Sequence, residues 1–328
     1  MFYKPTSFHI LEKENTENLI TWNYPTISDE LKTVLIKTCF SHGVEPCGLF
    51  YFKRLGKQWI YIKQFIVNND NAAAVIVVSQ CFQPKLYETL CDLFAAQYSR
   101  SRSGADLVKL YLQIYTKNGI YDNDDYISLN NFTWKTNLKG LIKSLGLETI
   151  LIYNALLLKK HTLIYHPSVE DLQEGLGSIT KLALMRKPED LLLPLANSLV
   201  EIKEVSTYSL IGTTNKSLLH HRNIFDVFVD LESHSITLTD KARDDFQMST
   251  LHKEIAHFLV QLSESDVSEQ DLIAAVARKT SDLFKYLKSF CDNKEEGIKV
   301  TSIESKLSNK KLGKFLINLA MTENILVI

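Results

Sequence analysis

The stretch "ILIYNALLLKKHTLIYHP", residues 150–167, places two lysines and a histidine between two apolar runs. A membrane-spanning helix needs about 20 apolar residues in succession, and the first run, 150–158, is much shorter. Residues 147–158 are rich in Leu and Ala, which predicts a helix of about three turns. Lysines are favourable at a helix C-terminus, and 162–166 then predicts a short strand that is buried on both faces and closed by Pro167. We interpret the break as a helix end that leads into a sheet.

Length and composition describe an ordinary globular protein. The chain has 328 residues, which is enough for two domains, and it is 45% apolar and 23% charged. Its formal net charge is −1 at pH 7. Binding to nucleic acid or to a membrane surface needs a basic excess, so this charge argues against a general role of either kind.

The cysteines and the first residues indicate a reducing compartment. The beginning of the chain lacks the apolar region and the cleavage site of a secretory signal. The cysteines are odd in number and form no CxxC pair. We expect reduced, mostly buried thiols in a cytoplasmic protein without bound metal. They are Cys39, Cys47, Cys81, Cys91 and Cys291.

The first 120 residues predict the element order ββαβββαα, in which a sheet is packed against helices. Ser28 is a helix N-cap, Gly56-Lys57 is a tight turn, and Pro84 opens a helix. The run "AAAVIVVSQ", 72–80, is apolar from 72 to 78 and rich in β-branched residues, which is typical of a central strand. The other expected strands are 7–13, 19–25, 48–55 and 58–67, and a second helix begins near Ala105.

The stretch "YDNDDYISLNNFTWKT", 121–136, is polar and has no period, so we expect an irregular linker. This expectation divides the chain into a domain of residues 1–120, the linker 121–136 and a domain of residues 137–328.

The second domain alternates short apolar runs with helical patterns, which predicts an α/β fold with a mainly parallel sheet. A helix begins at Ser168, "SITLTD" predicts an antiparallel edge strand, and two or three long helices finish the chain. In the first of these helices Leu251, Ile255, Phe258, Leu259 and Leu262 form an apolar stripe; in the next, the stripe is Leu272, Val276, Leu283, Leu287 and Phe290.

No nucleotide-binding motif is complete. Gly175 and Gly177 are a fragment of a dinucleotide fingerprint, but the third glycine is missing and the pair lies inside a predicted helix. Gly313-Lys314 does not belong to a P-loop. No G-x-S-x-G elbow is present, and no residue pattern indicates a nucleophile and base. We expect no cofactor and no catalytic side chains.

Histidine and aspartate spacings do not predict a metal site. Glu254 and His257 match only half of a di-iron motif. His252 lies about 140° around the helix from His257, so the two cannot bind one metal ion together. We place both on a solvated face of the helix. The aspartates of 122–125 lack the glycine and glutamate of a calcium loop. The basic stretch "SRSRSG", 99–104, is interpreted as a plain loop between two helices; the alternatives are a phosphorylation site and a contact with acidic lipid.

The second half of the chain resembles the DENN domain family. The resemblance rests on "LGLETILIYNALLLKKHTLIYHPS" (145–168), "TYSLIGTTN" (207–215) and "NIFDVFVDLESHSITLTD" (223–240). In the first half, "AAAVIVVSQCFQPKLYETLCDLF" (72–94) resembles the upstream lobe of the same family. The similarity covers nearly the whole chain and is densest from 145 to 284.

This resemblance implies a longin-type N-terminal lobe with α+β character, followed by a three-layer α/β lobe. It also implies a Rab-family GTPase as partner, with GDP release promoted by holding the GTPase switch regions. Such an exchange factor needs surfaces and no catalytic side chains. Small stand-alone members of the family are linked with late endosomes, where the protein would be peripheral and cytoplasmic. The alternative is a non-catalytic interaction subunit of an endosomal recycling assembly built on coiled-coil and COMM-domain subunits.

Two loops are candidate partner contacts. One is in the predicted linker and contains Tyr121, Asp124, Asp125 and Tyr126. The other is Thr213, Thr214 and Asn215, which follow a predicted parallel strand. Ligands of open α/β sheets gather at the carboxyl ends of strands. The alternative is that both loops only close the fold.

Overall fold

A computed structural model describes residues 5–14, 17–39, 49–68, 71–122, 125–186, 191–203, 207–291 and 297–327. The chain has an α/β fold and forms two compact units, Met1–Thr133 (unit 1) and Trp134–Ile328 (unit 2), which are described separately. The boundary between them falls inside the range 121–136.

Unit 1 contains the expected order of elements. They are β1 (Ser7–Glu14), β2 (Glu17–Tyr24), α1 (Asp29–Thr38), β3 (Phe50–Leu55), β4 (Gln58–Asn68), β5 (Asn71–Ser79), α2 (Pro84–Ser101) and α3 (Gly104–Lys117). The Ser28 hydroxyl caps α1 by accepting from the Leu31 N–H. Gly56 has a φ of +57° in the two-residue turn between β3 and β4, a conformation that favours glycine.

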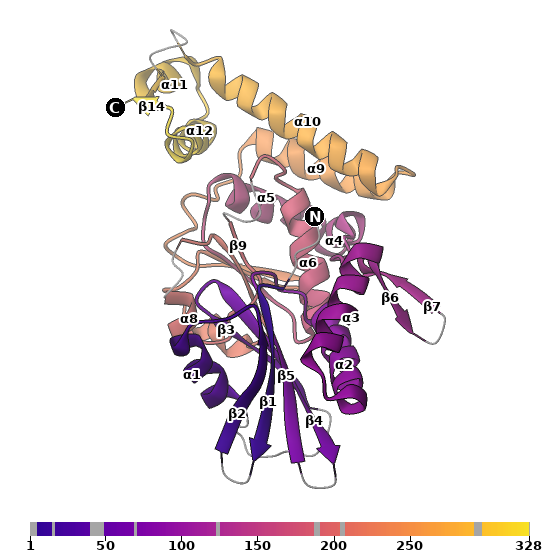
Figure 1. Ribbon diagram of the computed structural model, residues 1–328. Helices are drawn as coiled ribbons and strands as arrows, with labels where there is room; N and C mark the ends of the chain where they lie inside the picture. The colour runs from indigo at the N-terminus through magenta and orange to yellow at the C-terminus, as the bar shows by residue number, and fades with distance from the viewer. Residues whose placement is uncertain are drawn as a thin grey trace. The chain divides into compact units, whose positions relative to one another are not determined.

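The sheet of unit 1 is antiparallel, with the strand order β2-β1-β5-β4-β3. The apolar strand β5 lies in its centre, as predicted, and its residues 72–79 are all buried. Helices cover both faces (Figure 1). On one face, Leu35 of α1 joins the buried cluster; on the other, Phe94 of α2 stacks on Phe8 with ring centroids 5.4 Å apart. This arrangement agrees with the longin-type lobe that the resemblance implies.

The expectation of an irregular linker is wrong for the described part of 121–136. β6 (Gly119–Asp122) and β7 (Asp125–Ser128) pair as an antiparallel hairpin, and the 3-10 turn η1 (Leu129–Phe132) follows. Ile120 and Leu129 are buried. The segment is polar in composition, but the pairing of Ile120 with Ile127 and the burial of two apolar side chains give it regular structure.

Unit 2 contains a second sheet and most of the helices. Its strands are β8 (Thr162–Tyr165), β9 (Leu192–Leu193), β10 (Leu210–Thr213), β11 (Val227–Asp230), β12 (Ser235–Leu238), β13 (Ile298–Lys299) and β14 (Leu326–Val327). Its helices are α4 (Leu138–Leu145), α5 (Thr149–Leu157), α6 (Val169–Lys181), α8 (Leu199–Lys203), α9 (Thr250–Glu264), α10 (Glu269–Lys288), α11 (Val300–Lys306) and α12 (Lys310–Thr322), with the 3-10 turns η2 (Gly146–Glu148) and η3 (Lys216–His220).

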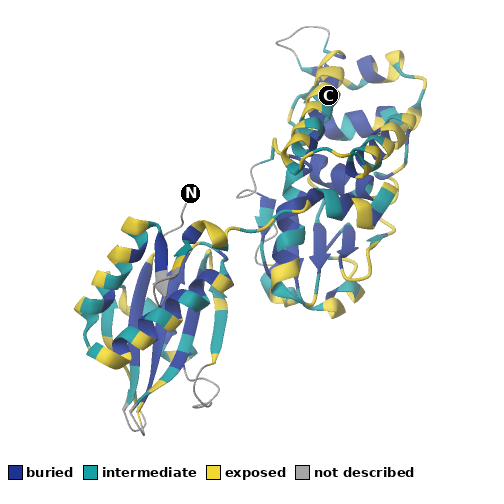
Figure 2. Cartoon of the chain, turned by 90° about the vertical axis from the view of Figure 1, so that its right-hand side faces the viewer, coloured by how far each residue is buried: buried dark blue, intermediate teal, exposed yellow. Residues whose placement is uncertain are grey.

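The main sheet of unit 2 has the order β12-β11-β8-β10-β9. β11, β8, β10 and β9 are parallel, and β12 is the antiparallel edge, so the predicted topology is confirmed. β8 is central and all four of its residues are buried. α8 covers one face through Ile202, while α6 contacts β8 and β10. α4 packs against α6, α9 and α10, and α10 also packs against α9. Figure 2 shows buried residues on both the strands and the helices of this unit.

One described segment, Leu138–Leu157, is long and apolar enough in composition to cross a membrane. It is not one straight helix, because Gly146 takes a φ of +57° between α4 and α5. In unit 2 the segment packs against α6 and α9, and more than half of it is buried. Most of its apolar side chains therefore belong to the core of this unit, while Leu147 is exposed.

The break between the two apolar runs of 150–167 is a helix C-cap, as predicted. Lys159 has a φ of +49°. Its N–H donates to the Leu156 carbonyl at 3.3 Å, and the Lys160 N–H donates to the Ala155 carbonyl at 2.9 Å. These two bonds are those of a Schellman motif, which usually places glycine at the left-handed position.

The prediction that His252 lies on a solvated face is wrong, whereas His257 is exposed. His252 is 1% exposed, and its ring meets Phe315 of α12 edge-on at 4.4 Å. Its Nδ1 accepts from the Ser249 N–H at 3.0 Å, which completes a capping box. The buried stripe of α9 is accordingly rotated toward His252, and Leu251, Phe258 and Leu262 are only half-buried.

Candidate partner-binding surface

The parallel strands of unit 2 end together at one edge of the sheet, which we call the carboxyl edge. It comprises the last residue of each strand and the residues that follow it: 165–166 at the end of β8, 213–216 at the end of β10 and 230–234 at the end of β11. The register pairs Thr213 with Tyr165 and Asp230 with Tyr165, so the three strand ends are level. Side chains from segments far apart in the sequence therefore meet here.

The loop Thr213–Asn215 is held by one asparagine. Asn197 Oδ1 accepts from the Thr213 hydroxyl at 3.1 Å, from the Thr214 N–H at 2.9 Å and from the Thr214 hydroxyl at 3.1 Å. Asn215 Nδ2 donates to the Asn197 carbonyl at 2.9 Å. Thr213 is fully buried and shapes the loop, whereas Thr214 and Asn215 are half-exposed.

A charged group adjoins this loop. Lys216 Nζ lies 3.0 Å from Asp230 Oδ2 and 3.5 Å from Glu232 Oε2. It also lies 5.2 Å from the ring centre of Tyr165, whose hydroxyl donates to Glu232 at 3.4 Å. The Lys216 and Glu232 side chains are about half exposed, while that of Asp230 is 7% exposed. The edge thus exposes the Lys216 ammonium and the Glu232 carboxylate, and the buried Asp230 carboxylate holds Lys216 in place.

Asp230 is ionised although it is buried. Burial alone would raise the pKa of this carboxyl group, but hydrogen bonds from Ser233 and the neighbouring Lys216 ammonium outweigh it, and the pKa lies below its ordinary value. The N–H groups of Glu232 and Ser233 each donate to Asp230 Oδ1 at 3.0 Å. The carboxylate therefore fixes the turn after β11 as well as Lys216.

A crevice of about 280 Å³ opens at the same edge, between the ends of β8 and β11. β8 and β11 are neighbours in the sheet. After β8 the chain adds β9 and β10 on the side of β8 that faces away from β11, and after β11 it adds β12 on the side of β11 that faces away from β8. Neighbouring strands whose connections diverge in this way mark the usual ligand position in an open α/β sheet. The crevice is lined by Asn137, Gly140, Leu141, Ser144, His166, Asp171, Glu174, Gly175, Ser178, Leu231 and His234.

These crevice residues are missing from the sequence-based candidates. His166 is the last residue of the predicted buried strand 162–166, so the rule that ligands gather at the carboxyl ends of strands, applied above to the loop after β10, also indicates His166. The helix residues Asp171 and Glu174 carry no comparable signal, because they reach the crevice only through the packing of α6 beside α4.

A larger groove of about 540 Å³ lies along α10 and shares no residue with the crevice. One wall of the groove is formed by α10, through Ala277, Ser281, Phe284 and Lys288. Leu184, Met185, Glu323 and Ile325 also line it. It is larger, but it lies away from the strand ends. We therefore assign the candidate surface to the carboxyl edge.

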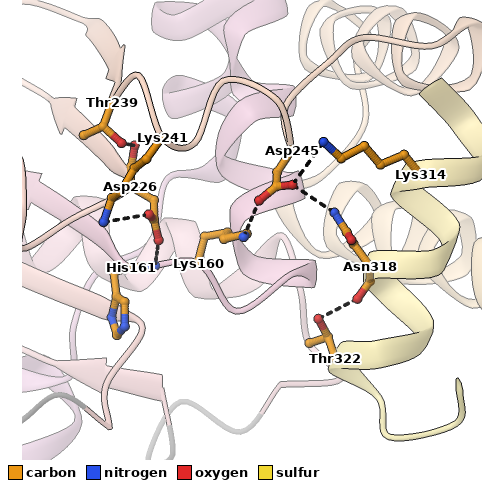
Figure 3. Close-up of polar contacts among 9 residues, drawn as sticks. All are labelled: Lys160, His161, Asp226, Thr239, Lys241, Asp245, Lys314, Asn318 and Thr322. Carbon is orange, nitrogen blue, oxygen red and sulfur yellow. Dashed lines mark hydrogen bonds and ion pairs between the residues drawn. The ribbon is translucent and has the colours of Figure 1, made fainter. Parts of the chain in front are cut away.

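The amino edge of the same sheet carries polar side chains that pair with one another (Figure 3). Asp226 accepts from the His161 N–H at 3.0 Å, and Lys241 Nζ lies 3.2 Å from its other oxygen. Lys160 Nζ lies 2.5 Å from Asp245. These contacts join the turn before β8 to later segments, so they support the fold.

The other sequence-predicted group lies in unit 1. Tyr121 and Asp125 belong to β6 and β7, but their side chains are outside the described part, and Asp124 is outside it altogether. Tyr126 is 50% exposed and its hydroxyl donates to the Asn118 carbonyl at 2.9 Å. The two groups of sequence-predicted residues lie in different compact units.

Neither a metal cluster nor a disulfide occurs among the described residues. No group of three or more His, Cys, Asp or Glu side chains there is arranged to hold a metal ion. Cys39, Cys81, Cys91 and Cys291 are free thiols, and Cys47 lies outside the described residues. Cys39 and Cys91 are buried.

In comparisons with known proteins, the chain is similar over nearly its whole length to proteins that all carry one name. A protein of Danio rerio called DENN domain-containing protein 10 is 28% identical over 342 residues, covering 98% of each chain. The Homo sapiens protein of the same name is 27% identical, over 97% of this chain and 96% of its own. That of Dictyostelium discoideum is 24% identical over 97% of both. No family model matches the chain.

Proposed function

Because the chain is a DENN-domain protein that resembles DENN domain-containing protein 10 over nearly its whole length, we propose that it binds a Rab-family GTPase and promotes GDP release. The observation that supports this most is the extent of the similarity, which includes both compact units. DENN domains act on Rab GTPases, and the proposal transfers that activity to this chain.

The mechanism rests on differential binding. The switch regions of a GTPase are held by contacts to phosphate and Mg²⁺, so a protein that binds them in another arrangement weakens nucleotide binding. A factor can shift this equilibrium only by its preference for the nucleotide-free form. A hundredfold weaker hold on GDP corresponds to about 2.7 kcal/mol of such preference. By reciprocity, GDP must weaken the binding of the factor to the GTPase by the same ratio.

The carboxyl edge of unit 2 suits such a contact. Thr214 and Asn215 are held by Asn197, and Lys216 is held by Asp230 and Glu232. Pre-ordered side chains lose little conformational entropy when a partner binds. We propose that the exposed groups of this edge contact the GTPase. Tyr126 of unit 1 is proposed as a partner contact by itself.

We also propose that the protein acts in the cytoplasm, peripherally on late endosomes. The formal net charge of −1 gives it no general attraction to anionic lipid. Recruitment by a membrane-bound GTPase is consistent with that charge. Tagged protein should leave late endosomes when its GTPase is depleted; retention there without the GTPase would contradict this part.

Two lysines provide a matched test of the binding edge. Lys216 and Lys241 are 51% and 53% exposed, and each pairs with one aspartate, at 3.0 and 3.2 Å. Lys216 lies at the carboxyl edge and Lys241 near the amino edge. We expect Lys216→Ala to weaken binding to nucleotide-free Rab about tenfold, and Lys241→Ala to leave it unchanged. Equal effects, or a loss with Lys241→Ala alone, would place the contact elsewhere.

A further inference from the structure

The basic stretch 99–104 is not the loop that its sequence predicts. α2 continues to Ser101 and α3 begins at Gly104, so only Arg102 and Ser103 connect the two helices. Arg102 has a φ of +53°, and Ser103 is extended with φ −116° and ψ 119°. The turn is therefore sharp, and Ser103, the residue directly before α3, has an extended backbone conformation.

The structure distinguishes the three serines of this stretch. Ser99 and Ser101 are helical, and the Ser101 hydroxyl donates to the Gln97 carbonyl at 3.2 Å. Among the described residues, the Ser103 hydroxyl accepts a single long hydrogen bond of 3.4 Å from the Asp106 N–H, and the Ser103 N–H donates to the Ser101 hydroxyl at 3.3 Å. Protein kinases bind the acceptor residue in an extended backbone, which among these three is the conformation of Ser103.

An arginine lies three residues before this serine. Arg100 is exposed, and among the described residues no ion pair or hydrogen bond of its side chain is found. Charge patterns of this kind select substrates for kinases. We propose that Ser103 is the acceptor site of an arginine-directed serine kinase, which recognises the Arg100 guanidinium. Ser103 Oγ forms a bond to the γ-phosphorus of ATP as the bond to the bridging oxygen breaks, ADP leaves, and the hydroxyl proton passes to the aspartate of the kinase.

The phosphate would change the contacts of Arg102. In the unmodified protein Arg102 Nη1 lies 2.8 Å from Glu12 Oε1, and the guanidinium lies 5.7 Å from the centre of the Tyr98 ring. A phosphoserine carries a charge of about −2 at pH 7 and binds arginine more strongly than a carboxylate does. Arg102 then leaves Glu12 and binds the phosphate. Among the described residues, Glu12 still accepts the hydrogen bond from the Tyr98 hydroxyl, which is 3.2 Å from its Oε1.

The first test identifies the acceptor. The full-length protein is incubated with magnesium ATP and a purified calmodulin-dependent serine kinase that requires arginine three residues before its acceptor. Peptide mass spectrometry should find the phosphate on Ser103, at a rate at least tenfold lower in Arg100→Ala. Ser99→Ala, at an exposed position of α2, is the control and should leave the rate unchanged. Phosphate on Ser99 or Ser101, no incorporation, or the same rate without Arg100 overturns the proposal.

The second test measures the change of partner. Glu12→Gln removes the carboxylate that Arg102 binds in the unmodified protein. This substitution should lower the melting temperature of the unmodified protein, and should change that of the phosphorylated protein by less than half as much. Equal shifts in the two forms would show that Arg102 stays with Glu12 and would overturn the exchange of partners.

Discussion

Lys160 Nζ lies 2.5 Å from Asp245 Oδ2, so the turn that precedes the central strand of unit 2 is tied to the segment before α9 (Figure 3). The second oxygen of Asp245 accepts from Asn318 Nδ2 at 3.1 Å and lies 3.8 Å from Lys314 Nζ. Through this one carboxylate, the last long helix of the chain is joined to the entrance of β8.

Asp245→Asn should therefore destabilise the protein. The substitution removes the charge that Lys160 and Lys314 share, and a hydrogen bond to a charged group contributes about 1.5–3 kcal/mol, so we expect a loss of about 1–2 kcal/mol in chemical denaturation at pH 7. Asp240→Asn is the control, since its carboxylate is 75% exposed, and it should change stability by less than about 0.5 kcal/mol.

The same carboxylate gives a pH dependence. Burial raises the pKa of Asp245, but the hydrogen bond and charge of Lys160, with Lys314 and Asn318, hold it below the ordinary value of 3.8. The native state then binds fewer protons than the unfolded state, so the stabilisation is complete above pH 3.8 and is lost as the pH falls through the lower native pKa. If Asp245→Asn is equally costly at pH 7 and pH 2, this account of the ion pair is wrong.

Lys159→Gly should stabilise the protein. Lys159 has a φ of +49°, and a left-handed conformation costs a residue with a side chain about 1 kcal/mol relative to glycine. The matched control is Lys109→Gly, an exposed position inside α3, where glycine costs about 1 kcal/mol. The two variants carry the same chemical change and should shift the free energy of unfolding in opposite directions. A loss of stability in Lys159→Gly would show that the Schellman geometry is wrong.

His252→Gln should weaken the acid sensitivity of the protein. Burial lowers the pKa of His252 to about 4, whereas in the unfolded chain it is about 6.5. Between these values the unfolded state binds one more proton than the native state, so stability falls as the pH is lowered through this range. Glutamine is a usual partner of serine in a capping box, so the variant keeps the cap while removing the titration.

The measurement is the free energy of unfolding at pH 7 and pH 5. At pH 5 the histidine accounts for a loss of about 2 kcal/mol, and the wild-type protein should lose that much more than His252→Gln. His257→Gln, at an exposed position on the same helix, should behave like the wild type. Identical pH slopes for wild type and His252→Gln would mean that His252 is not buried in its neutral form.

Thiol reactivity should follow burial. Cys91 is fully buried, and burial raises the pKa of its thiol; burial also raises the pKa of Cys81 to about 12. Because the thiolate is the reactive form, iodoacetamide at pH 8 should modify half-buried Cys291 well before Cys91. Mass spectrometry of timed samples checks the order. Early labelling of Cys91 in folded protein would contradict the packing of α2.

The sequence predicts most of the fold because the decisive signals are local. Ser28 and Ser168 cap helices by their own hydroxyls, and the mostly apolar, buried runs 72–79 and 162–165 form the two central strands. Each such signal acts within a few residues and needs no distant partner. The mainly parallel character of the sheet in unit 2 also follows, because the spacing of the runs excludes hairpins; the order of its strands was not predicted.

The features that sequence analysis missed depend on distant partners. His252 is polar and lies beside an apolar stripe, and its burial is decided by Phe315, 63 positions later in the chain. The crevice at the carboxyl edge is lined by residues of α4, of α6 and of the turn after β11, which only the packing of these three segments brings together. The position of Thr213 at the end of a parallel strand was predicted from the sequence. Its burial was not, because it depends on the hydrogen bond to Asn197.

The rate of GDP release tests the central claim most directly. A panel of Rab GTPases loaded with fluorescent GDP is mixed with substoichiometric protein and excess unlabelled nucleotide, beside affinity purification from cells. The account predicts that at least one Rab loses GDP tenfold faster or more, and that this Rab binds tightest without nucleotide. If no Rab is accelerated while coiled-coil and COMM-domain subunits of an endosomal recycling assembly co-purify stoichiometrically, the protein is an interaction subunit and the exchange function is excluded.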